Sequence, residues 1–327
     1  MIAYVIRRVL NALIVLLVVA FISFLLFNFV GDPVTNMLGE NAPPADKDAL
    51  RVALGLDQPM ILQFLRFVAR AGGGEFGLSF RNLVPVGEIL RTRVPATLEL
   101  SLCAMVLALL VGIPTGVYTG LRRNAPIAQM IQALSLVGVS VPSFVTGILL
   151  ILVFAVELGW FASFGRGDVV AFGWWTTGLL TVSGLKSLVL PTITLALFPA
   201  TLIMRLVRAE MLEVLRTDYV RFARARGLTH RAVHFGHALK NTLVPVITIT
   251  GLQLGSVIAF AILTETVFQW PGLGLLVVQA MTFGDIPVLS AYLLLVATLF
   301  VSINLTVDLL YYAVDPRLRL EQRVAAG

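Results

Sequence analysis

The chain has 327 residues, of which 58% are hydrophobic and only 13% are charged. A soluble globular domain carries about 25% charged residues, so this composition excludes a soluble enzyme and requires lipid as the solvent for much of the chain. The net charge of +6 could suggest a nucleic-acid partner, but the basic residues are scattered between apolar runs, which excludes a basic nucleic-acid-binding domain.

Six apolar runs are predicted to cross the membrane as helices, which makes the chain an all-α polytopic membrane protein. A helix needs about 20 apolar residues to cross roughly 30 Å of hydrocarbon. Five runs reach this length: 9–30, 98–119, 131–157, 243–263 and 288–313. A sixth, 188–206, is slightly shorter and contains Pro191 and Pro199, which membrane helices tolerate when neighbouring groups satisfy the freed carbonyls.

Residues 31–96 are expected to form an external loop between the first two spans. The turn signals "GDP", "NAPP" and "AGGG" surround an amphipathic stretch, "PMILQFLRFVARA", for which we expect a helix lying on the outer membrane surface. The segment 72–79, "GGGEFGLS", has the glycine spacing of a phosphate-binding loop, but Leu78 stands where that loop needs a lysine. It is interpreted as a turn, and neither a catalytic site nor a cofactor is predicted in the chain.

Residues 169–183 form a shorter apolar stretch, "VVAFGWWTTGLLTVS", which is interrupted by glycine. The stretch is too short to span the membrane, and its Trp pair is typical of the membrane–water interface. We therefore expect an external interfacial segment here.

The distribution of Lys and Arg predicts that both termini are cytoplasmic, because short cytoplasmic loops carry an excess of these residues. With the N-terminus inside, the two short external loops hold only Arg166 and Lys186. The segments placed inside hold fifteen of the 24 basic residues: Arg7, Arg8, Arg122, Arg123, Arg205, Arg208, Arg216, Arg221, Arg224, Arg226, Arg231, Lys240, Arg317, Arg319 and Arg323.

The ionisable residues give no sign of a proton-coupled carrier or a metal site. Three carboxylates near span ends are interpreted as interfacial and hydrogen-bonded: Glu99, Glu265 and Asp308. Three histidines share one predicted helix face: His230, His234 and His237. Because no cysteine or carboxylate lies near them in the sequence, we interpret them as a polar surface against another protein, with no metal.

The loop between the fourth and fifth spans is predicted to form a compact, basic hairpin of short helices. Helices are expected at 208–215 and 218–225, with Gly227 ending the second of them in the manner of a C-terminal glycine. Thr229 is expected to cap a third helix that runs towards Pro245. Such a hairpin is too small for catalysis and has the shape of a plug for a groove on a partner protein.

This loop, "DYVRFARARGLTHRAVHFGHALKNTLVPV", resembles the cytoplasmic coupling loop of binding-protein-dependent ABC import permeases, and most closely the first-permease type of the dipeptide/oligopeptide/nickel branch. The resemblance extends in the same order through "GEFGLSF", "RVPATLELSL", "ETVFQWPGLG" and "DLLYYAVDPRLR". Of the general permease pattern E-A-A-xxx-G-x9-I-x-L-P, Ala223 and Gly227 match, whereas Arg221 replaces the Glu and His237 replaces the Ile.

The resemblance implies a permease subunit of an ATP-driven importer in the bacterial cytoplasmic membrane. The implied partners are a second permease, two ATP-binding subunits that hydrolyse ATP, an external solute-binding protein and membrane lipid. Peptides or similar small solutes are the expected substrates, with nickel, opines or another non-peptide solute as alternatives, and a secondary peptide carrier as the alternative of another class. The residues expected to couple the loop to the ATPase are Ala223, Arg224, Ala225, Arg226, Gly227, Leu228, His237 and Asn241.

In the fifth span, Gly251 and Gly255 permit close approach of a second helix, either from the second permease, which we favour, or from the same chain. The segment 270–274, "WPGLG", is interpreted as a re-entrant or surface element at the external mouth. The residues predicted for the permease interface or path are Gly251, Gly255, Glu265, Trp270, Pro271 and Gly272. The expected parts of the chain are the N-terminal tail and first span (1–30), the external loop (31–96), the permease core (97–315) with its coupling loop (207–242), and a cytoplasmic tail (316–327).

Overall fold

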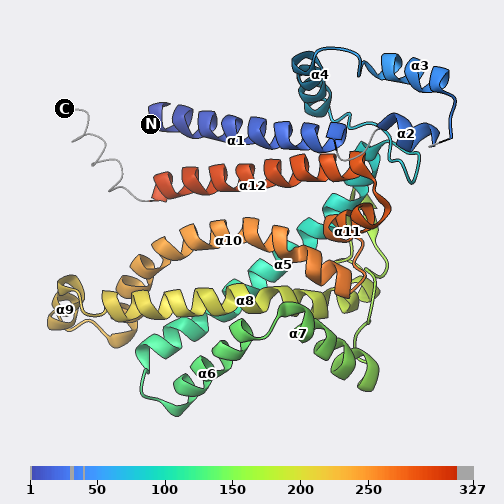
Figure 1. The fold of residues 1–327 in the computed structure, drawn as a ribbon. Helices are drawn as coiled ribbons and strands as arrows, with labels where there is room; N and C mark the ends of the chain where they lie inside the picture. The colour runs from blue at the N-terminus through green and yellow to red at the C-terminus, as the bar shows by residue number, and fades with distance from the viewer. Residues whose placement is uncertain (1, 30–32, 40, 315–327) are drawn as a thin grey trace. The chain divides into compact units, whose positions relative to one another are not determined.

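A computed structural model describes residues 2–29, 33–39 and 41–314. The chain divides into two compact units (Figure 1). The first comprises Met1–Thr97, Ala171–Thr176 and Pro271–Ser302, and the second comprises Leu98–Val170, Thr177–Trp270 and Ile303–Gly327. The predicted tail, 316–327, and the end of the predicted first span at Val30 lie outside the described residues.

The all-α prediction is confirmed for the described part of the chain, in which only two three-residue strands interrupt a succession of helices. Five of these helices are long and apolar enough to cross a membrane, and a bent pair of helices makes a sixth span if it is counted as one. They are α1 (Ile2–Phe29), α5 (Val86–Leu121), α8 (Val182–Val214), α10 (Leu239–Val267) and α12 (Ile286–Val314), with the pair formed by α6 (Pro126–Ser140) and α7 (Ser143–Leu150) together with the π-helix η1 (Ile151–Glu157).

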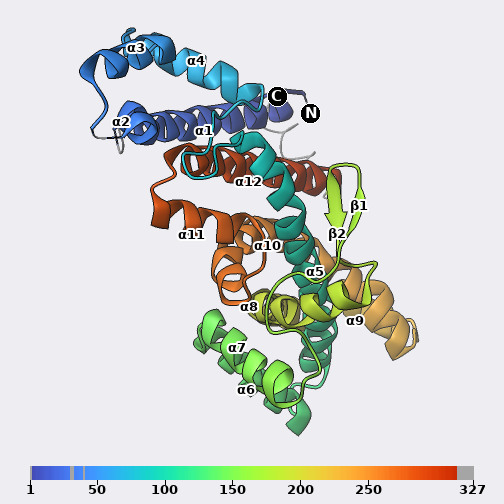
Figure 2. The same cartoon turned by 90° about the vertical axis from the view of Figure 1, so that its right-hand side faces the viewer.

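In the first unit, α1 and the first part of α12 run side by side (Figures 1 and 2). Two serines join them: the hydroxyl of Ser23 donates to the carbonyl of Ser290 at 3.3 Å, and the hydroxyl of Ser290 donates back to the carbonyl of Ser23 at 3.2 Å. Both side chains are buried. Small hydroxyl residues allow this close approach and link helices by hydrogen bonds where lipid offers none.

The predicted amphipathic helix is present as α4 (Met60–Gly72). Its Phe64 packs edge-on against Phe21 and Phe24 of α1, with ring centroids 5.6 and 5.5 Å apart. Beside Phe64 on α4, Ile61 is 76% exposed and Leu65 is 57% exposed, as expected of a helix that lies against lipid.

The interpretation of "NAPP" as a turn is only half right. A helix, α3 (Pro44–Leu54), begins directly at its second proline, and a further short helix, α2 (Pro33–Leu38), precedes it. Proline favours the first position of a helix because its missing N–H would have no partner there in any case.

The segment "GGGEFGLS" is a turn, as predicted. The amide of Ser79 donates to the carbonyl of Val84 at 3.0 Å, and its hydroxyl donates to the carboxylate of Asp285. The same carboxylate accepts from the amide of Phe80 at 3.1 Å, so the serine is engaged by a buried acid within the chain.

Helix α5 begins at Val86, inside the segment 31–96 that was predicted to form the external loop. Val86 and Leu90 are one helical turn apart and both are buried in the first unit, at 0% and 4% exposure. Their burial extends the helix N-terminally beyond the part whose composition resembles a membrane span.

The third predicted span, at 131–157, is not one straight helix. α6 and α7 meet at a bend of 106°, and Pro142 at this bend has extended backbone angles (φ −56°, ψ 137°). By contrast, α8 continues through Pro191 and Pro199 and is considerably longer than the span predicted at 188–206. A proline breaks a helix only where nothing nearby satisfies the carbonyl that it frees.

Within the second unit, α5 packs closely on α8 through glycines. A Cβ added to Gly112 would lie 2.8 Å from the carbonyl oxygen of Ala200, and one added to Gly116 would lie 2.7 Å from that of Met204. This spacing of small residues brings two helix backbones together.

The stretch 169–183, predicted to be an external segment and not a span, contains no helix before Val182. Its strands β1 (Val170–Phe172) and β2 (Trp175–Thr177) pair as a two-stranded hairpin (Figure 2). Trp174 and Trp175 stack edge-on beside its turn, with ring centroids 5.5 Å apart.

Candidate functional site

The loop between α8 and α10, here called the coupling hairpin (residues 207–242), contains one separate helix, α9 (Asp218–Ala225), at the predicted bounds. The expected helix at 208–215 is wrong as a separate element, because it forms the last turns of α8. The expected third helix is the π-helix η2 (Ala232–Ala238), which continues into α10 and through Pro245.

The C-terminus of α9 is closed by Gly227, as predicted. Gly227 lies in the left-handed region with φ +78°. Its amide donates to the carbonyl of Arg224 at 2.9 Å, and the amide of Leu228 donates to that of Ala223 at 3.3 Å. These two bonds define a Schellman motif, which satisfies the last carbonyls of a helix and turns the chain back. Thr229 then accepts a hydrogen bond from the amide of Ala232 at 3.3 Å, as expected of a cap.

The coupling hairpin has a small apolar core of its own. Val220 and Ala223 of α9 are buried against Val233 of η2, and the last residues of α8, Val214 and Leu215, pack on them. These contacts hold α9 in one place relative to the ends of the two long helices.

Polar bonds fix the same arrangement on either side of this core. The side-chain amide of Asn241 donates to the hydroxyl of Tyr219 at 2.6 Å, which joins the start of α10 to α9. The hydroxyl of Thr242 lies 3.3 Å from the sulfur of Met211, and both side chains are buried between α10 and α8. The hairpin is therefore a fixed shape presented on two long helices.

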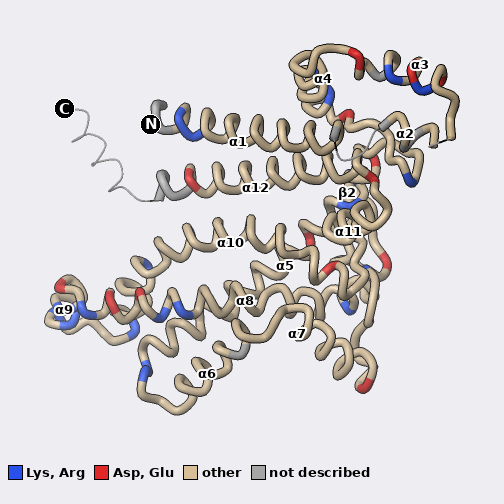
Figure 3. The backbone as a smooth tube through the Cα atoms, viewed as in Figure 1, with Lys and Arg blue, Asp and Glu red and all other residues tan. Residues whose placement is uncertain are grey.

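The outer surface of the coupling hairpin combines exposed aromatic side chains with arginines. Phe222 is 65% exposed and Phe235 is 54% exposed. Figure 3 shows basic residues gathered around α9, and the guanidinium of Arg226 lies 5.9 Å from the centroid of the Phe222 ring. Large exposed apolar residues rimmed by charge are typical of a protein interaction surface.

The predicted coupling residues divide between the core and the surface of the hairpin. Ala223 is buried in the core. The others are exposed on the hairpin: Arg224, Ala225, Arg226, Gly227, Leu228, His237 and Asn241. Sequence reasoning missed Tyr219, Phe222 and Phe235 as surface residues, although aromatic residues between arginines were a usable signal.

Two of the three histidines of the hairpin lie close together. The rings of His230 and His234 are 5.9 Å apart, and burial, followed by the charges of Arg224 and His230, lowers the pKa of His234. Among the described residues, no three His, Cys, Asp or Glu side chains come together in a way that could hold a metal ion.

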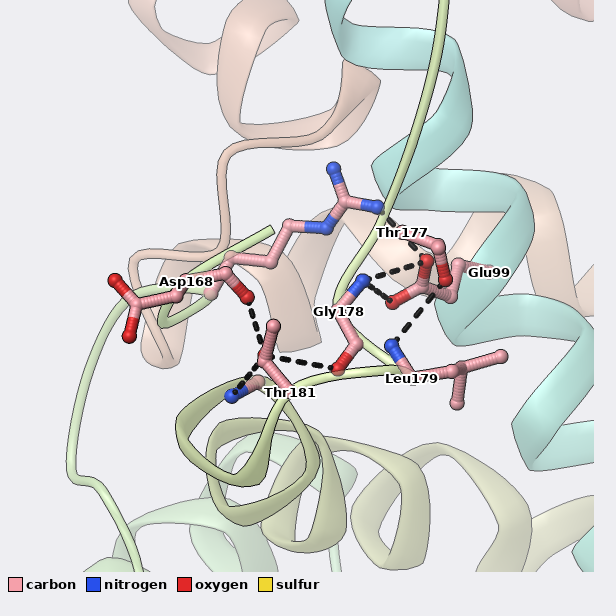
Figure 4. Close-up of polar contacts among 8 residues, drawn as sticks. Glu99, Asp168, Thr177, Gly178, Leu179 and Thr181 are labelled. Carbon is pink, nitrogen blue, oxygen red and sulfur yellow. Dashed lines mark hydrogen bonds and ion pairs between the residues drawn. The ribbon is translucent and has the colours of Figure 1, made fainter. Parts of the chain in front are cut away.

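A second polar cluster lies in the same unit, where α5 meets the segment before α8 (Figure 4). Glu99, predicted to be hydrogen-bonded at the interface, is buried and forms an ion pair with Arg166, with 2.8 Å between Oε2 and Nη2. The amide of Gly178 donates to both carboxylate oxygens, at 3.1 and 3.3 Å. The guanidinium of Arg166 lies 5.9 Å from the Trp270 ring.

Most of the residues predicted for the permease interface or path are buried within the chain. A Cβ on Gly251 would lie 2.1 Å from Val307 of the same chain, so its small size serves packing within the chain. Glu265 and Trp270 are fully buried, which is contrary to a surface position for "WPGLG". Gly255 and Gly272 are buried as well, and Pro271 is half-buried.

A cavity of about 330 Å³ lies in the second unit between the α6–α7 bend, α8 and α10. Its wall is mainly apolar, with hydroxyl and amide groups and no charged side chain. The polar groups are those of Ser143, Thr146, Thr194, Gln253 and Ser256. Sequence reasoning did not find this cavity, although two prolines of the apolar runs, Pro142 and Pro199, line it.

Comparison with known proteins identifies the family. Residues 112–320 match the family described as binding-protein-dependent transport system inner membrane component, and residues 1–101 match the N-terminal family of the same membrane components. The chain belongs to this family of membrane components. It is a multi-pass membrane permease subunit of an ABC transporter.

Three curated relatives of this permease cover nearly its whole length. It is 38% identical to the dipeptide transport system permease protein DppB of Alkalihalophilus pseudofirmus, over 98% of this chain and 100% of the relative. It is 41% identical to the di/tripeptide transport system permease protein DppB of Pseudomonas aeruginosa, over 92% and 94%. It is 40% identical to the dipeptide transport system permease protein DppB of Escherichia coli K12, over 91% and 94%.

The permease also shares its fold with a chain of the inward-facing MetNI methionine ABC transporter. The TM-score is 0.57 at 21% sequence identity, over 69% of this chain and 96% of the other.

Proposed function

We propose that this permease forms, with a second permease, the membrane path of an ATP-driven importer of di- and tripeptides. The observation that carries the coupling part of the proposal is the hairpin surface. A short helix with its own core holds Phe222 among arginines, and the described part of the chain leaves this side chain 65% exposed. Such a fixed, projecting aromatic residue fits a pocket on a partner protein.

We propose that the partner is an ATP-binding subunit, one for each permease of the pair. The turn that has the glycine spacing of a phosphate-binding loop lacks the lysine, and its Ser79 is bonded to Asp285 instead. The energy for transport is therefore assigned to two partner subunits, with no catalysis and no cofactor in this chain.

The peptide class follows from the relatives. Proteins that are about 40% identical over more than nine tenths of this chain are named as dipeptide or di/tripeptide permeases. An external solute-binding protein is proposed to deliver the peptide. The uncharged cavity beside the α6–α7 bend is proposed to form part of the path. A second permease is proposed to complete the path, because six spans in one chain are few for a peptide-sized channel.

The orientation remains part of the proposal. The concentration of basic residues on the coupling hairpin supports a cytoplasmic position for it and for both termini, with Arg166 and Lys186 on the external side. The family's description implies the inner membrane of a bacterium.

The test is transport by the whole complex in proteoliposomes, with this permease, its partner permease, both ATP-binding subunits and the solute-binding protein. We expect ATP-dependent uptake of a labelled dipeptide, and no ATP hydrolysis by this chain alone. Uptake of nickel or an opine in place of peptides would overturn the peptide assignment, and ATP turnover by the purified chain would overturn the assignment of the ATPase to a partner.

A further inference from the structure

The segment that joins η1 to α8 is fixed to α5 and to the ends of α8 and α10 in the second unit by one cluster of contacts, here called the clasp (Glu99, Arg166, Asp168, Gly178 and Thr181). Figure 4 shows Glu99 on α5 facing this segment. Its carboxylate forms an ion pair with Arg166 at 2.8 Å and accepts a hydrogen bond from the amide of Gly178. One buried acid thus holds two points of the segment that are twelve residues apart in the chain.

The clasp also reaches α8. The hydroxyl of Thr181 donates to the carbonyl of Asp168 at 2.6 Å and accepts from the amide of Gly184 at 3.0 Å, which caps the first turn of α8. The hydroxyl of Ser183 donates to the carboxylate of Asp168 at 2.6 Å. The start of α8 is thereby tied to the same segment that Glu99 holds.

The end of α10 is the third point of attachment. The amide of Gly165 donates to the carbonyl of Phe268 at 2.9 Å, directly after the last residue of α10. The neighbouring Arg166 places its guanidinium 5.9 Å from the ring of Trp270, which is fully buried. Cation–π contact and the ion pair to Glu99 thus use the same guanidinium.

Stability alone does not account for this arrangement. The side chains of Arg166 and Glu99 are 7% and 2% exposed. At such a depth an ion pair commonly stabilises a fold no better than apolar residues of the same size, but it accepts only one geometry. A guanidinium bonded to a carboxylate that also accepts from a backbone amide defines position and direction in a way that apolar side chains do not.

We propose that Glu99 is a positioning residue that joins α5 to the clasped ends of α8 and α10 in one block, which moves as a unit when the transporter changes conformation. This inference rests on the proposed function for its transport readout, but the rigidity of the block is measurable without any substrate.

The first experiment measures that rigidity in the assembled complex. Spin labels replace Leu102 on α5 and Leu185 on α8, which are 48% and 45% exposed and lie about one turn beyond Glu99 and Thr181, in a variant without the native cysteine. The distance between the labels is expected to be the same without nucleotide and with trapped ATP. A distance that changes between these states in the unmodified clasp would overturn the proposal, whatever solute the complex carries.

The second experiment removes the charges. In Glu99→Gln, hydrogen exchange of the Gly178 amide is expected to accelerate about tenfold or more, because a buried charge loses its partner. The label distribution should broaden, and transported solute per ATP hydrolysed should fall. Lys186→Gln, which removes an exposed charge near the start of α8, is the matched control and should leave all three quantities unchanged.

The double variant Glu99→Gln with Arg166→Met separates positioning from stability, since it buries no unpaired charge. We expect its melting temperature to recover towards the wild-type value while transport per ATP stays low. Recovery of transport together with stability would show that the clasp acts only through folding and would overturn the proposal. If the wild-type complex carried a solute other than a peptide, the proposed substrate would fail, and the same variants would test the clasp with that solute.

Discussion

Gly227 offers the sharpest test of the coupling hairpin, because only its backbone conformation opposes substitution. Its φ is +78°, and a Cβ added there meets nothing within 4 Å. The left-handed region costs an ordinary residue about 1–2 kcal/mol, and a β-branched residue more. Since 1–2 kcal/mol corresponds to a factor of about 5–30 in an equilibrium constant, Gly227→Val should shift the equilibrium from the closed towards the opened hairpin by about this factor.

The assay is the affinity of the purified permease pair for its ATP-binding subunits. If the closed hairpin becomes the minor state, the apparent Kd rises in proportion to the fall in its population. We therefore expect the affinity of Gly227→Val for the ATP-binding subunits to fall by up to about 5–30-fold, with normal membrane insertion. Gly227→Asn is the matched control, because asparagine tolerates the left-handed region. Gly236→Ala is a second control, because Gly236 is also exposed with open space around it but has no positive φ.

Two outcomes would refute this reasoning. One is wild-type affinity in Gly227→Val, which would mean that the Schellman turn does not position the docking surface. The other is equal weakening by Val and Asn, which would mean that the glycine contacts the partner directly.

The remaining predictions concern orientation, charge and pH. A cysteine placed at Glu75, in a variant without the native cysteine, should react with an impermeant reagent from outside, and one at His234 should not; the reverse would invert the topology. Arg221→Gln should change the melting temperature little, since the ion pair with Asp218, at 3.3 Å, is exposed and such pairs contribute about 0–1 kcal/mol; a large loss would show an unrecognised role in folding. Burial, and after it the charge of Arg224, lowers the pKa of His234, so an opened hairpin binds the proton more readily than the closed one. The protection of the hairpin amides against hydrogen exchange, relative to unstructured amides at the same pH, should therefore decrease as the pH falls through about 6.5, the ordinary histidine value, and this decrease should be smaller in His234→Gln.

The bounds of α9 and its glycine ending were predictable because their signals are local. A helix followed by Gly227 requires only the conformational freedom of that one residue, and the capping threonine follows two positions later. The amphipathic α4 was predictable for the same reason, since its apolar face repeats at helical spacing.

The course of the chain at its prolines was not predictable. Pro142 stands at a bend of 106°, whereas Pro191 and Pro199 lie inside a continuous helix. The difference depends on which neighbouring groups satisfy the freed carbonyls, and these neighbours come from distant parts of the sequence. Gly112 and Gly116 were recognisable as a close-packing pattern from their spacing alone, but their partner helix was not.

The clasp shows the same limit for a site. Glu99 and Arg166 are 67 residues apart, so no local pattern connects them. The sequence did offer one indirect signal, since Arg166 is one of only two basic residues in the short loops predicted to be external, and Glu99 is an acid near a predicted span end. Opposite charges that are unusual in their surroundings are candidates for a pair.

The central claim is that the coupling hairpin receives the ATP-binding subunit, and site-specific photo-crosslinking tests it most directly. A photoreactive phenylalanine derivative is placed at Phe222, on the exposed side of α9, and in a second variant at Leu65, on the exposed side of α4. In the assembled complex, we predict a crosslink from position 222 to the ATP-binding subunit and none from position 65. A crosslink to that subunit from position 65, with none from position 222, would contradict the claim.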